Sequence, residues 1–346
     1  MKILVSSKPS ILLISRLPVH GAFLRKFLSK YYNVVWVGQT FPFKITLFNV
    51  FYVISLEFWK LLVNFKKLHF SLVIIQFVSL DGIVAVMFKR IFKTKLVLFA
   101  VGSDVLKVRE HAFANPIIKF IIAESDFVFC ASGLIEENLK KMGFDTSKMK
   151  VVPSVIDFDD FEPYYGSKMY DVVNVGALDS NKNQMLLVKA CELLPSVKAL
   201  IIGDGPLRGF LESESVKKKL DIVFLGNVSH KQIFKELQKS RIYVHTSKSE
   251  GLPVAVLEAM FAGLPVILME GPYAYGFKHR YGFLLRIASN NSAQELATKI
   301  LEVFQSYEDE LHNSAFNKRI ILKLISKTPG DLKKTLDDVM QNNYAK

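Results

Sequence analysis

The sequence predicts an α/β protein made of two doubly wound, Rossmann-like domains that face each other across a cleft. Short runs rich in β-branched and aromatic residues alternate with amphipathic segments along the whole chain, which is typical of parallel βαβ units. The chain has 346 residues, 50% of them hydrophobic, and this is enough for two cores of ordinary size. Ligands of such domains bind beyond the carboxyl ends of the strands, so the loops there are expected to carry the function.

The first half supplies one series of strands and helices. Its expected strands are rich in β-branched and aromatic residues and cover Ile11–Ser15, Asn33–Val37, Ser71–Phe77, Lys95–Val101, Asp126–Ala131 and Lys150–Pro153. Its expected helices have apolar residues at helical spacing and cover Ala22–Tyr31, Ile45–Phe65, Asp81–Phe92, Pro116–Glu124 and Ile135–Met142. The stretch Asp157–Lys168 contains Pro163, Gly166 and Ser167, so it is expected to be a linker.

A second series begins after this linker. Its expected strands are Asp171–Gly176, Val197–Ile202, Ile222–Leu225, Ile242–His245 and Val266–Met269, and its helices include Asn183–Leu194 and Lys231–Lys239. Pro253 suits the first position of a further helix, which Gly263 and Pro265 end. We therefore expect a first domain at 1–165, a second at 166–325, and a C-terminal helix at 326–346 that packs on the first.

Two carboxylates flank the start of the helix at Pro253. Glu250 precedes the helix and Glu258 lies inside it, so at about 1.5 Å per residue they reach groups roughly 7–12 Å apart on one ligand. The N–H groups of Gly251, Leu252 and Val254, with the positive end of the helix dipole, face the gap between the two carboxylates. This combination favours a phosphate flanked by hydroxyl-bearing sugars.

The charge balance predicts an attraction to anions. The chain has 45 Lys and Arg against 32 Asp and Glu, a formal net charge of +13. Anionic lipid and nucleotide phosphate fit this charge, whereas nucleic acid is disfavoured because the basic residues are scattered and no nucleic-acid-binding signature accompanies them. The two cysteines form no disulfide framework, so a reducing, cytoplasmic setting is expected.

The segment Ile45–Phe65 is the most hydrophobic long window. Asn49, Glu57 and Lys60 interrupt it, so it is too polar for a spanning helix. It is either an interfacial helix that lies on an anionic membrane surface, with neighbouring lysines near the head groups, or a helix that packs on its own sheet. In the first case the protein is peripheral on the cytoplasmic face of the membrane.

Three more loops follow strands of the second half. Lys182 stands at a helix start that is otherwise short of negative charge, where an ammonium group is unfavourable unless an anion offsets it. Gly203-Asp204-Gly205 forms a turn through which backbone approaches a flat ligand, and the backbone of Gly226-Asn227-Val228 can hydrogen-bond a base edge. Taken singly, each feature also has an ordinary structural interpretation: Lys182 as a solvated surface lysine, and the two glycine loops as tight turns.

In this order the loops and the paired glutamates closely resemble the family-4-type glycosyltransferases with the GT-B fold, the glycosyl transferases group 1. The matching residues are Gly176…Lys182, Gly203-Asp204-Gly205-Pro206-Leu207-Arg208, Phe224-Leu-Gly226, Ser247…Glu250-Gly251…Glu258-Ala-Met-Phe-Ala-Gly263-Leu-Pro265 and Tyr281-Gly282. The resemblance implies a retaining, metal-independent enzyme that moves a sugar from a nucleotide-diphosphate sugar to an acceptor hydroxyl.

The resemblance also implies roles for single residues. Glu250 would hydrogen-bond hydroxyls of the donor sugar, Glu258 the ribose and Lys182 the diphosphate, so Glu250 and Lys182 are the catalytic candidates. The remaining candidates for donor binding are Gly251, Leu252, Val254, Gly176, Gly203, Asp204, Gly226, Asn227, Val228 and, from the opposite domain, Gly21.

The first half resembles the family more loosely. Gly21 before the helix Ala22–Tyr31 looks like the family's N-terminal glycine loop, and the stretch from Ala100 to Val105 resembles its His-Gly-Ser-Asp loop, which makes Gly102 and Asp104 acceptor-side candidates. Two positions depart from the pattern: Ala177 stands where the family usually has Arg, and Val101 where it usually has His. Each lost contact to the leaving diphosphate costs on the order of 100-fold in rate unless another cation replaces it. The candidates for that cation are Lys8, Arg16, Arg25 and Lys248.

No metal or cofactor is expected, because the sugar nucleotide is a substrate. The Asp-X-Asp sequence Asp157-Phe158-Asp159 falls in the linker and is interpreted as solvated acidic residues. The seven histidines have no metal-ligand spacing, and His245 is interpreted as a satisfied residue at a strand end.

The acceptor is expected to be a glycan, above all a lipid-linked or membrane-bound one, because the first domain has an aromatic and basic surplus. The rival hypothesis is a catalytically silent scaffold that keeps the fold and binds nucleotide or a partner without turnover, motivated by Ala177 and Val101. Retention of Glu250, Glu258 and Lys182 together argues against the scaffold.

Overall fold

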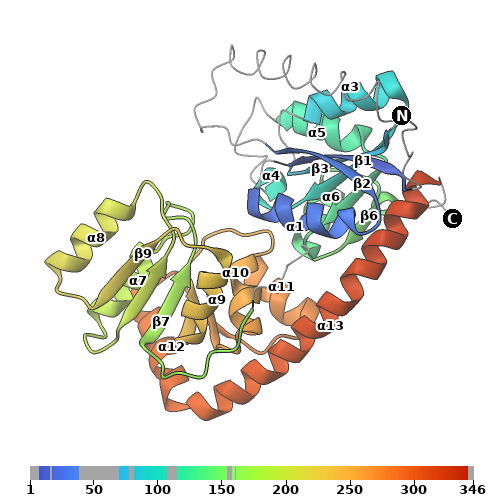
Figure 1. The fold of residues 1–346 in the computed structure, drawn as a ribbon. Coiled ribbons are helices and arrows are strands. Elements are labelled where there is room, and N and C mark those ends of the chain that lie inside the picture. The colour runs from blue at the N-terminus through green and yellow to red at the C-terminus, as the bar shows by residue number, and fades with distance from the viewer. Residues whose placement is uncertain are drawn as a thin grey trace, which may run out of the picture. The chain divides into compact units, whose positions relative to one another are not determined.

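The computed structural model describes residues 8–15, 18–38, 70–77, 82–106, 115–153, 158–159 and 161–341. The chain divides into two compact units, one made of Met1–Ile156 with Ser326–Lys346 and the other of Asp157–Ile325. Each unit is built on a parallel six-stranded sheet with helices packed on it (Figure 1). The predicted α/β class with two doubly wound sheets is confirmed. The expected helix Ile45–Phe65 lies outside the described residues.

The sheet of the first unit has the strand order β2-β1-β3-β4-β5-β6. Its strands are β1 (Ser10–Ser15), β2 (Asn33–Gly38), β3 (Phe70–Gln76), β4 (Lys95–Ala100), β5 (Phe127–Cys130) and β6 (Met149–Val151). Its helices include α1 (Pro18–Ser29), α3 (Gly82–Phe92), α4 (Ser103–Leu106), α5 (Asn115–Glu124) and α6 (Gly133–Lys141). Leu13, Ile74 and Phe129 are fully or almost fully buried at its centre, and the expected strands agree with these bounds to within two residues at either end.

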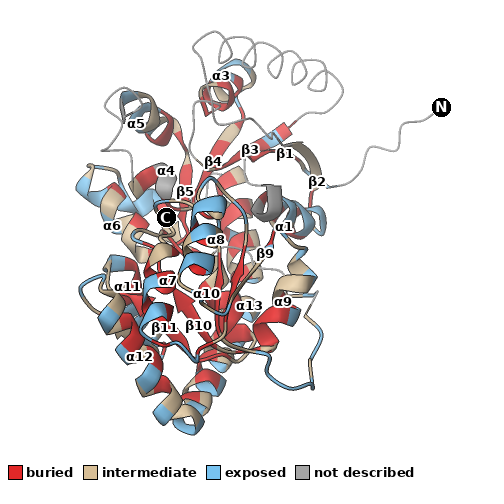
Figure 2. Ribbon diagram, turned by 90° about the vertical axis from the view of Figure 1, so that its left-hand side faces the viewer, coloured by how far each residue is buried: buried red, intermediate tan, exposed pale blue. Residues whose placement is uncertain are grey.

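The sheet of the second unit has the order β12-β11-β10-β7-β8-β9. Its strands are β7 (Tyr170–Val175), β8 (Ala199–Ile202), β9 (Ile222–Gly226), β10 (Ser240–His245), β11 (Val266–Met269) and β12 (Arg286–Ala288). Its helices are α7 (Met185–Glu192), α8 (Arg208–Lys217), α9 (His230–Gln238), α10 (Val254–Phe261), α11 (Pro272–Tyr281) and α12 (Ala293–Gln305). Buried residues concentrate on the strands and on the helix faces that cover them (Figure 2).

The chain changes direction across this second sheet. From β7 it moves outward through β8 and β9, and then returns to place β10 on the other side of β7. The loops after β7 and β10 therefore leave neighbouring strands toward opposite sides of the sheet, and the carboxyl edge between them is the position of the ligand-binding crevice of doubly wound sheets.

The stretch after Ile156 packs on the second unit, and its described residues are more than a linker. Phe158 stacks on Phe261 of α10 with ring centroids 3.9 Å apart, and Phe161 meets Phe234 of α9 edge to face at 5.6 Å. The backbone N–H of Tyr164 donates to Gln238 at 2.8 Å. These aromatic contacts place the division between the units at Ile156/Asp157, earlier than the expected 165/166.

The last helix, α13 (Tyr307–Met340), contributes to both units. It continues through Pro329, although a proline inside a helix removes one backbone hydrogen bond. After the proline, Leu332 and Leu336 are fully buried in the core of the first unit, and the Tyr32 hydroxyl donates to Asp337 at 2.7 Å. Residues 326–346 therefore belong to the first unit.

Candidate functional site

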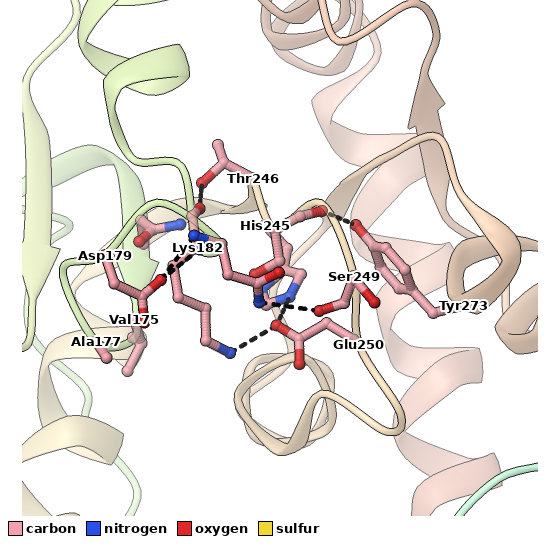
Figure 3. Close-up of polar contacts among 12 residues, drawn as sticks. Val175, Ala177, Asp179, Lys182, His245, Thr246, Ser249, Glu250 and Tyr273 are labelled. Atoms are coloured by element: carbon pink, nitrogen blue, oxygen red, sulfur yellow. Dashed lines mark hydrogen bonds and ion pairs between the residues drawn. The ribbon is translucent and has the colours of Figure 1, made fainter. Parts of the chain in front are cut away.

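Lys182 and Glu250 meet at the carboxyl edge of the second sheet. Lys182 lies in the loop after β7 and Glu250 in the loop after β10, so the two loops on either side of the crevice supply one group each. The Lys182 ammonium points to the Glu250 carboxylate, with 2.6 Å between Nζ and Oε1 (Figure 3). The side chains are 25% and 12% exposed, which leaves the pair accessible to a ligand from one side.

The backbone of Lys182 is fixed by its neighbours. Asp179 Oδ1 accepts hydrogen bonds from the N–H groups of Asn181 at 2.9 Å and of Lys182 at 2.8 Å, which closes a tight turn. The Thr246 hydroxyl, from the opposite loop, donates to the Lys182 carbonyl at 2.6 Å. Asn181 also donates to the carbonyl of Ser249 at 3.0 Å. The two loops are therefore joined by hydrogen bonds, and the backbone of Lys182 is held in place.

Glu250 is an ionised carboxylate in a mostly buried position. Burial alone raises its pKa, but the hydrogen bond from His245 and the charge of Lys182 outweigh burial and lower the pKa to about 2. His245 is 1% exposed, and its Nε2 lies 3.3 Å from Glu250 Oε1. Burial lowers the pKa of His245, so the imidazole is neutral at pH 7. Its Nε2 therefore carries the proton that faces Glu250.

The helix after Glu250 begins one residue later than predicted. Pro253 is the N-cap residue with φ −73° and ψ 100°, and Val254 is the first residue of α10. Proline at this position has no N–H that would need a partner, and its fixed φ also suits an extended residue. Gly251 and Leu252 are buried. Because only Gly251, Leu252 and Pro253 separate Glu250 from Val254, the helix starts close to the Lys182–Glu250 pair. The first turn of a helix has N–H groups without intrahelical acceptors, and these favour an anion.

Glu258 is held by a residue that the sequence did not single out. Its carboxylate lies in α10 with 7% of the side chain exposed, and Oε1 is 2.8 Å from Nε2 of His230. His230 is the first residue of α9 and packs edge to face on Phe234, with ring centroids 4.7 Å apart. Burial among apolar groups is tolerated for a carboxylate only with such a partner.

The three glycine loops lie side by side at the same edge. The N–H of Gly203 donates to the carbonyl of Gly226 at 2.9 Å, and the N–H of Gly176 donates to Ile202 at 3.0 Å. Gly203 has φ +133°, and a Cβ there would stand 2.0 Å from the Gly176 carbonyl oxygen. Only glycine allows the loops after β7 and β8 to pack this closely, which leaves backbone groups at the surface of the crevice.

The remaining candidates of these loops are also placed by the structure. Asp204 is exposed; its carboxylate accepts from the N–H of Gly205 at 2.7 Å and pairs with Arg208 at 3.4 Å. Asn227 is exposed and Val228 half-buried, directly after β9. Asp204 is thus bonded within its own loop.

The candidates of the first unit are less completely defined. Gly21 lies inside α1, which begins at Pro18, and the predicted glycine loop before a helix at Ala22 is therefore wrong. Its lack of a side chain allows α1 to approach β1, since a Cβ at Gly21 would stand 2.5 Å from Ser15 Oγ. The Gly102 carbonyl accepts from Val105 and Leu106 at 2.9 Å at the start of α4, whereas the side chain of Asp104 lies outside the described residues.

Sequence reasoning missed the two histidines of the site. Histidine at a strand end and at a helix start has ordinary structural explanations, and neither His230 nor His245 has metal-ligand spacing. The signal for His245 was its place two residues after Tyr243 on the same face of β10, five residues before Glu250. Within the described residues, no three His, Cys, Asp or Glu side chains come together as metal ligands.

Residues 157–319 match the family model of the glycosyl transferases group 1. The second unit is therefore a domain of this family, and the chain, with its two parallel sheets, has the GT-B fold. HepE from Anabaena, solved in complex with UDP and glucose, is similar over 95% of this chain and 100% of its own, with a TM-score of 0.75 and 16% identity. Sucrose-phosphate synthase from Thermosynechococcus elongatus is similar over 97% and 100%, with a TM-score of 0.82 and 15% identity.

Curated relatives match about half of this chain. A component of the phosphatidylinositol N-acetylglucosaminyltransferase of Arabidopsis thaliana is 28% identical over 160 residues, which are 43% of this chain and 36% of that protein. The uncharacterized glycosyltransferase MJ1059 from Methanocaldococcus jannaschii is 29% identical over 210 residues, 53% of this chain and 50% of its own. The chain thus spans about a third to a half of the length of these relatives.

Proposed function

We propose that the protein is a retaining, metal-independent glycosyltransferase that moves a sugar from a nucleotide-diphosphate sugar to an acceptor hydroxyl. The observation that carries the proposal is the Lys182–Glu250 pair, 2.6 Å apart at the crevice between β7 and β10 and next to the start of α10. A cation, an ionised carboxylate and the start of a helix meet where doubly wound sheets bind nucleotides.

The proposed reaction breaks the bond between the anomeric carbon and the diphosphate oxygen and forms a bond from that carbon to the acceptor oxygen on the same face. The acceptor proton passes to the departing diphosphate. Lys182 and the N–H groups of Gly251, Leu252 and Val254 stabilise the negative charge that develops on the diphosphate. Glu250 holds sugar hydroxyls, so the anomeric carbon is oriented while positive charge grows on it.

The nucleoside end of the donor is assigned to the other side of the crevice. Glu258, held through Oε1 by His230, accepts hydrogen bonds from the ribose hydroxyls. The backbone at Gly203, Gly226 and Val228 lies at the same edge of the sheet and meets the base. UDP is our first choice of nucleotide, because the structurally similar HepE was solved with UDP.

The proposed acceptor is a lipid-linked or other membrane-bound glycan. The net charge of +13 favours an anionic surface, and several relatives have names of enzymes that act on lipids, among them components of phosphatidylinositol N-acetylglucosaminyltransferases and the sulfoquinovosyl transferase of Arabidopsis. Among the described helices, none has the length and apolar character needed to cross a bilayer. We propose a peripheral position on the cytoplasmic face of the membrane.

A panel of labelled UDP-, GDP- and ADP-sugars tests the reaction. We expect slow hydrolysis of one donor by the wild-type chain, and loss of this hydrolysis in Glu250→Ala and Lys182→Ala. Nucleotide binding without turnover on any donor or acceptor would instead support the catalytically silent scaffold. Ala177 and Val101 favour this alternative, because they stand where the family usually has Arg and His. Flotation with vesicles of phosphatidylglycerol and phosphatidylcholine tests the membrane surface, and a chain that stays with the soluble fraction contradicts that part.

A further inference from the structure

In each of the two glutamates of the site, Glu250 and Glu258, only one of the two carboxylate oxygens is hydrogen-bonded by a described residue. Both contacts of Glu250, from Lys182 Nζ at 2.6 Å and from His245 Nε2 at 3.3 Å, fall on Oε1. The contact of Glu258, from His230 Nε2 at 2.8 Å, also falls on its Oε1. Within the described part of the chain, Oε2 of either glutamate accepts no hydrogen bond. Each carboxylate is thus held through one oxygen, and the other oxygen is left for a ligand.

We infer that His245 and His230 are positioning residues, each of which fixes one oxygen of a glutamate so that the other oxygen is presented to the hydroxyl groups of the donor. The inference rests on the proposed function and deepens it. His245 is 1% exposed, so it acts through Glu250 and does not touch a ligand. His230 sits at the start of α9, on a different element from the glutamate that it holds.

Lys182 and His245 then have different parts in holding Glu250. The Lys182 ammonium is drawn to the diphosphate when the donor binds, because two phosphate charges compete with one carboxylate for it. The 2.6 Å ion pair with Glu250 is therefore the exchangeable contact of the resting site. His245, buried behind the carboxylate, keeps its hydrogen bond and holds Glu250 in place once the lysine has turned to phosphate.

Tyr243 sets the orientation of His245. The two side chains lie two residues apart on one face of β10, with rings stacked at 6.1 Å between centroids. The Tyr243 hydroxyl lies 3.1 Å from His245 Nδ1. The hydroxyl also lies 3.5 Å from the Val175 carbonyl, which is the longer of its two contacts. Because Nε2 carries the proton that faces Glu250, Nδ1 is an acceptor, and the tyrosine hydroxyl donates to it at the shorter distance. The chain Tyr243, His245, Glu250 thus fixes both the tautomer and the carboxylate.

The two histidines are expected to affect different kinetic constants. Glu250 addresses the sugar at the reacting carbon, so a displaced carboxylate lowers kcat more than it raises KM. Glu258 addresses the ribose, whose contacts are the same in the ground state and the transition state, so its displacement raises KM and weakens UDP binding. A loss of folding alone would also lower the apparent kcat and leave KM unchanged, so the recovery of kcat in a conservative variant is the decisive readout for His245, and the rise in KM is the decisive readout for His230.

Hydrolysis of UDP-glucose and calorimetric binding of UDP test the inference in the full chain. We expect His245→Leu to lower kcat about tenfold to 100-fold with KM changed less than about threefold, since a displacement of the order of an ångström has effects of this size. His245→Gln carries an amide N–H near the place of Nε2, and we expect it to recover kcat to within about threefold of the wild type. His312→Gln, in α13 outside the site, is the matched control and keeps both constants.

His230→Leu is expected to raise KM and the UDP dissociation constant about tenfold, with kcat within about threefold, and His230→Gln to restore binding. If His245→Leu does not fold, Tyr243→Phe carries the test, because it removes only one hydroxyl; we expect kcat to fall about threefold. Wild-type constants in His245→Leu, or in Tyr243→Phe where that variant replaces it, overturn the inference, and so does equal loss in His245→Leu and His245→Gln.

The same measurements separate this inference from the proposed function. A wild-type chain that neither binds UDP nor hydrolyses any donor of the panel overturns the proposed function, and the inference with it. A wild-type chain that hydrolyses UDP-glucose while the histidine variants match it overturns the inference alone.

Discussion

Both units are built on a parallel six-stranded sheet in which the chain changes direction, but the strand orders differ and the chemistry at that point is very different. In the first unit β1 is flanked by β2 and β3, and in the second β7 is flanked by β8 and β10. At the first of these points the Ser15 hydroxyl donates to Gln76 at 2.9 Å, both side chains being buried and neutral. At the second, an ammonium and a carboxylate meet at 2.6 Å.

This difference separates what topology supplies from what the loops supply. Either sheet opens a crevice beside its first strand, because the chain leaves that strand in one direction and returns on its other side. Only the loops after β7 and β10 place opposite charges there among the described residues. A charged phosphate is therefore expected to bind to the second unit, and under the proposed function we expect the first unit to recognise the acceptor.

The largest expected effect is that of Glu250→Gln on donor hydrolysis. The variant keeps the shape of the side chain but loses the negative charge that faces Lys182 and His245, so we expect a fall of about 100-fold or more in kcat for UDP-glucose. Glu212→Gln is the matched control, because Glu212 pairs with Arg208 on α8 of the same unit at 2.8 Å. A kcat of Glu250→Gln within about threefold of the wild type would show that the Glu250 carboxylate has no part in the reaction.

A large loss of stability is expected for Gly203→Ala. The new Cβ would stand 2.0 Å from the backbone oxygen of Gly176, at φ +133°, and we expect the free energy of unfolding of the second unit to fall by about 3 kcal/mol. Gly21→Ala in the first unit meets the side chain of Ser15 at 2.5 Å, which moves more easily, so its loss should be smaller.

Urea unfolding followed by the fluorescence of each variant measures the two losses. Gly209→Ala is the control, because nothing lies within 4 Å of its Cβ position in α8 and alanine favours the helix. A larger loss for Gly21→Ala than for Gly203→Ala would reverse the comparison of the units.

Most of the fold could be predicted from the sequence, because buried parallel strands consist of apolar runs that propensity and turn residues delimit. The strand Ser10–Ser15 differs by one residue from its prediction, Ile11–Ser15. Two features depended on packing that the sequence does not express locally. The stretch after Ile156 has the composition of a linker, yet the rings of Phe158 and Phe161 pack against α9 and α10. The expected C-terminal helix at 326–346 is the end of a longer helix, α13, which begins at Tyr307 in the second unit and continues through Pro329.

The site was predictable to the extent that it depends on spacing along one segment. Glu250 lies in the loop before α10 and Glu258 lies inside α10, so both were identified from their spacing around one helix start, and Lys182 was identified by its unfavourable place near another helix start. His230 and His245 were not identified, because their partners are contacts across elements: Glu258 lies 28 residues from His230 in sequence. A glycine loop at Gly21 was predicted from its resemblance to the family, but a helix that begins at Pro18 includes this residue.

The pH dependence of the free energy of unfolding should distinguish the charged Lys182–Glu250 pair from the neutral Ser15–Gln76 pair. The pKa of Glu250 is lowered from 4.5 to about 2, so its ionised form stabilises the folded state above pH 4.5, and this contribution is lost as the pH falls toward 2. A displacement of this size corresponds to about 3 kcal/mol as an upper value. Urea midpoints of the wild type and Glu250→Gln should differ at pH 6 and converge toward pH 3. A difference that stays constant over this range would contradict a lowered pKa.

The smallest expected effect is that of Ser15→Ala, at the neutral point of the first unit. It removes the hydroxyl that donates to Gln76 and leaves a buried amide oxygen with one donor fewer, so we expect the free energy of unfolding to fall by about 1 kcal/mol. The difference between pH 6 and pH 3 should equal that of the wild type, because neither group of the Ser15–Gln76 pair titrates in this range. Donor hydrolysis should stay within about twofold, since the diphosphate is assigned to the second unit. A drop in kcat as large as that of Glu250→Gln would show that the Ser15–Gln76 pair of the first unit takes part in donor hydrolysis. It would contradict the assignment of the diphosphate to the second unit.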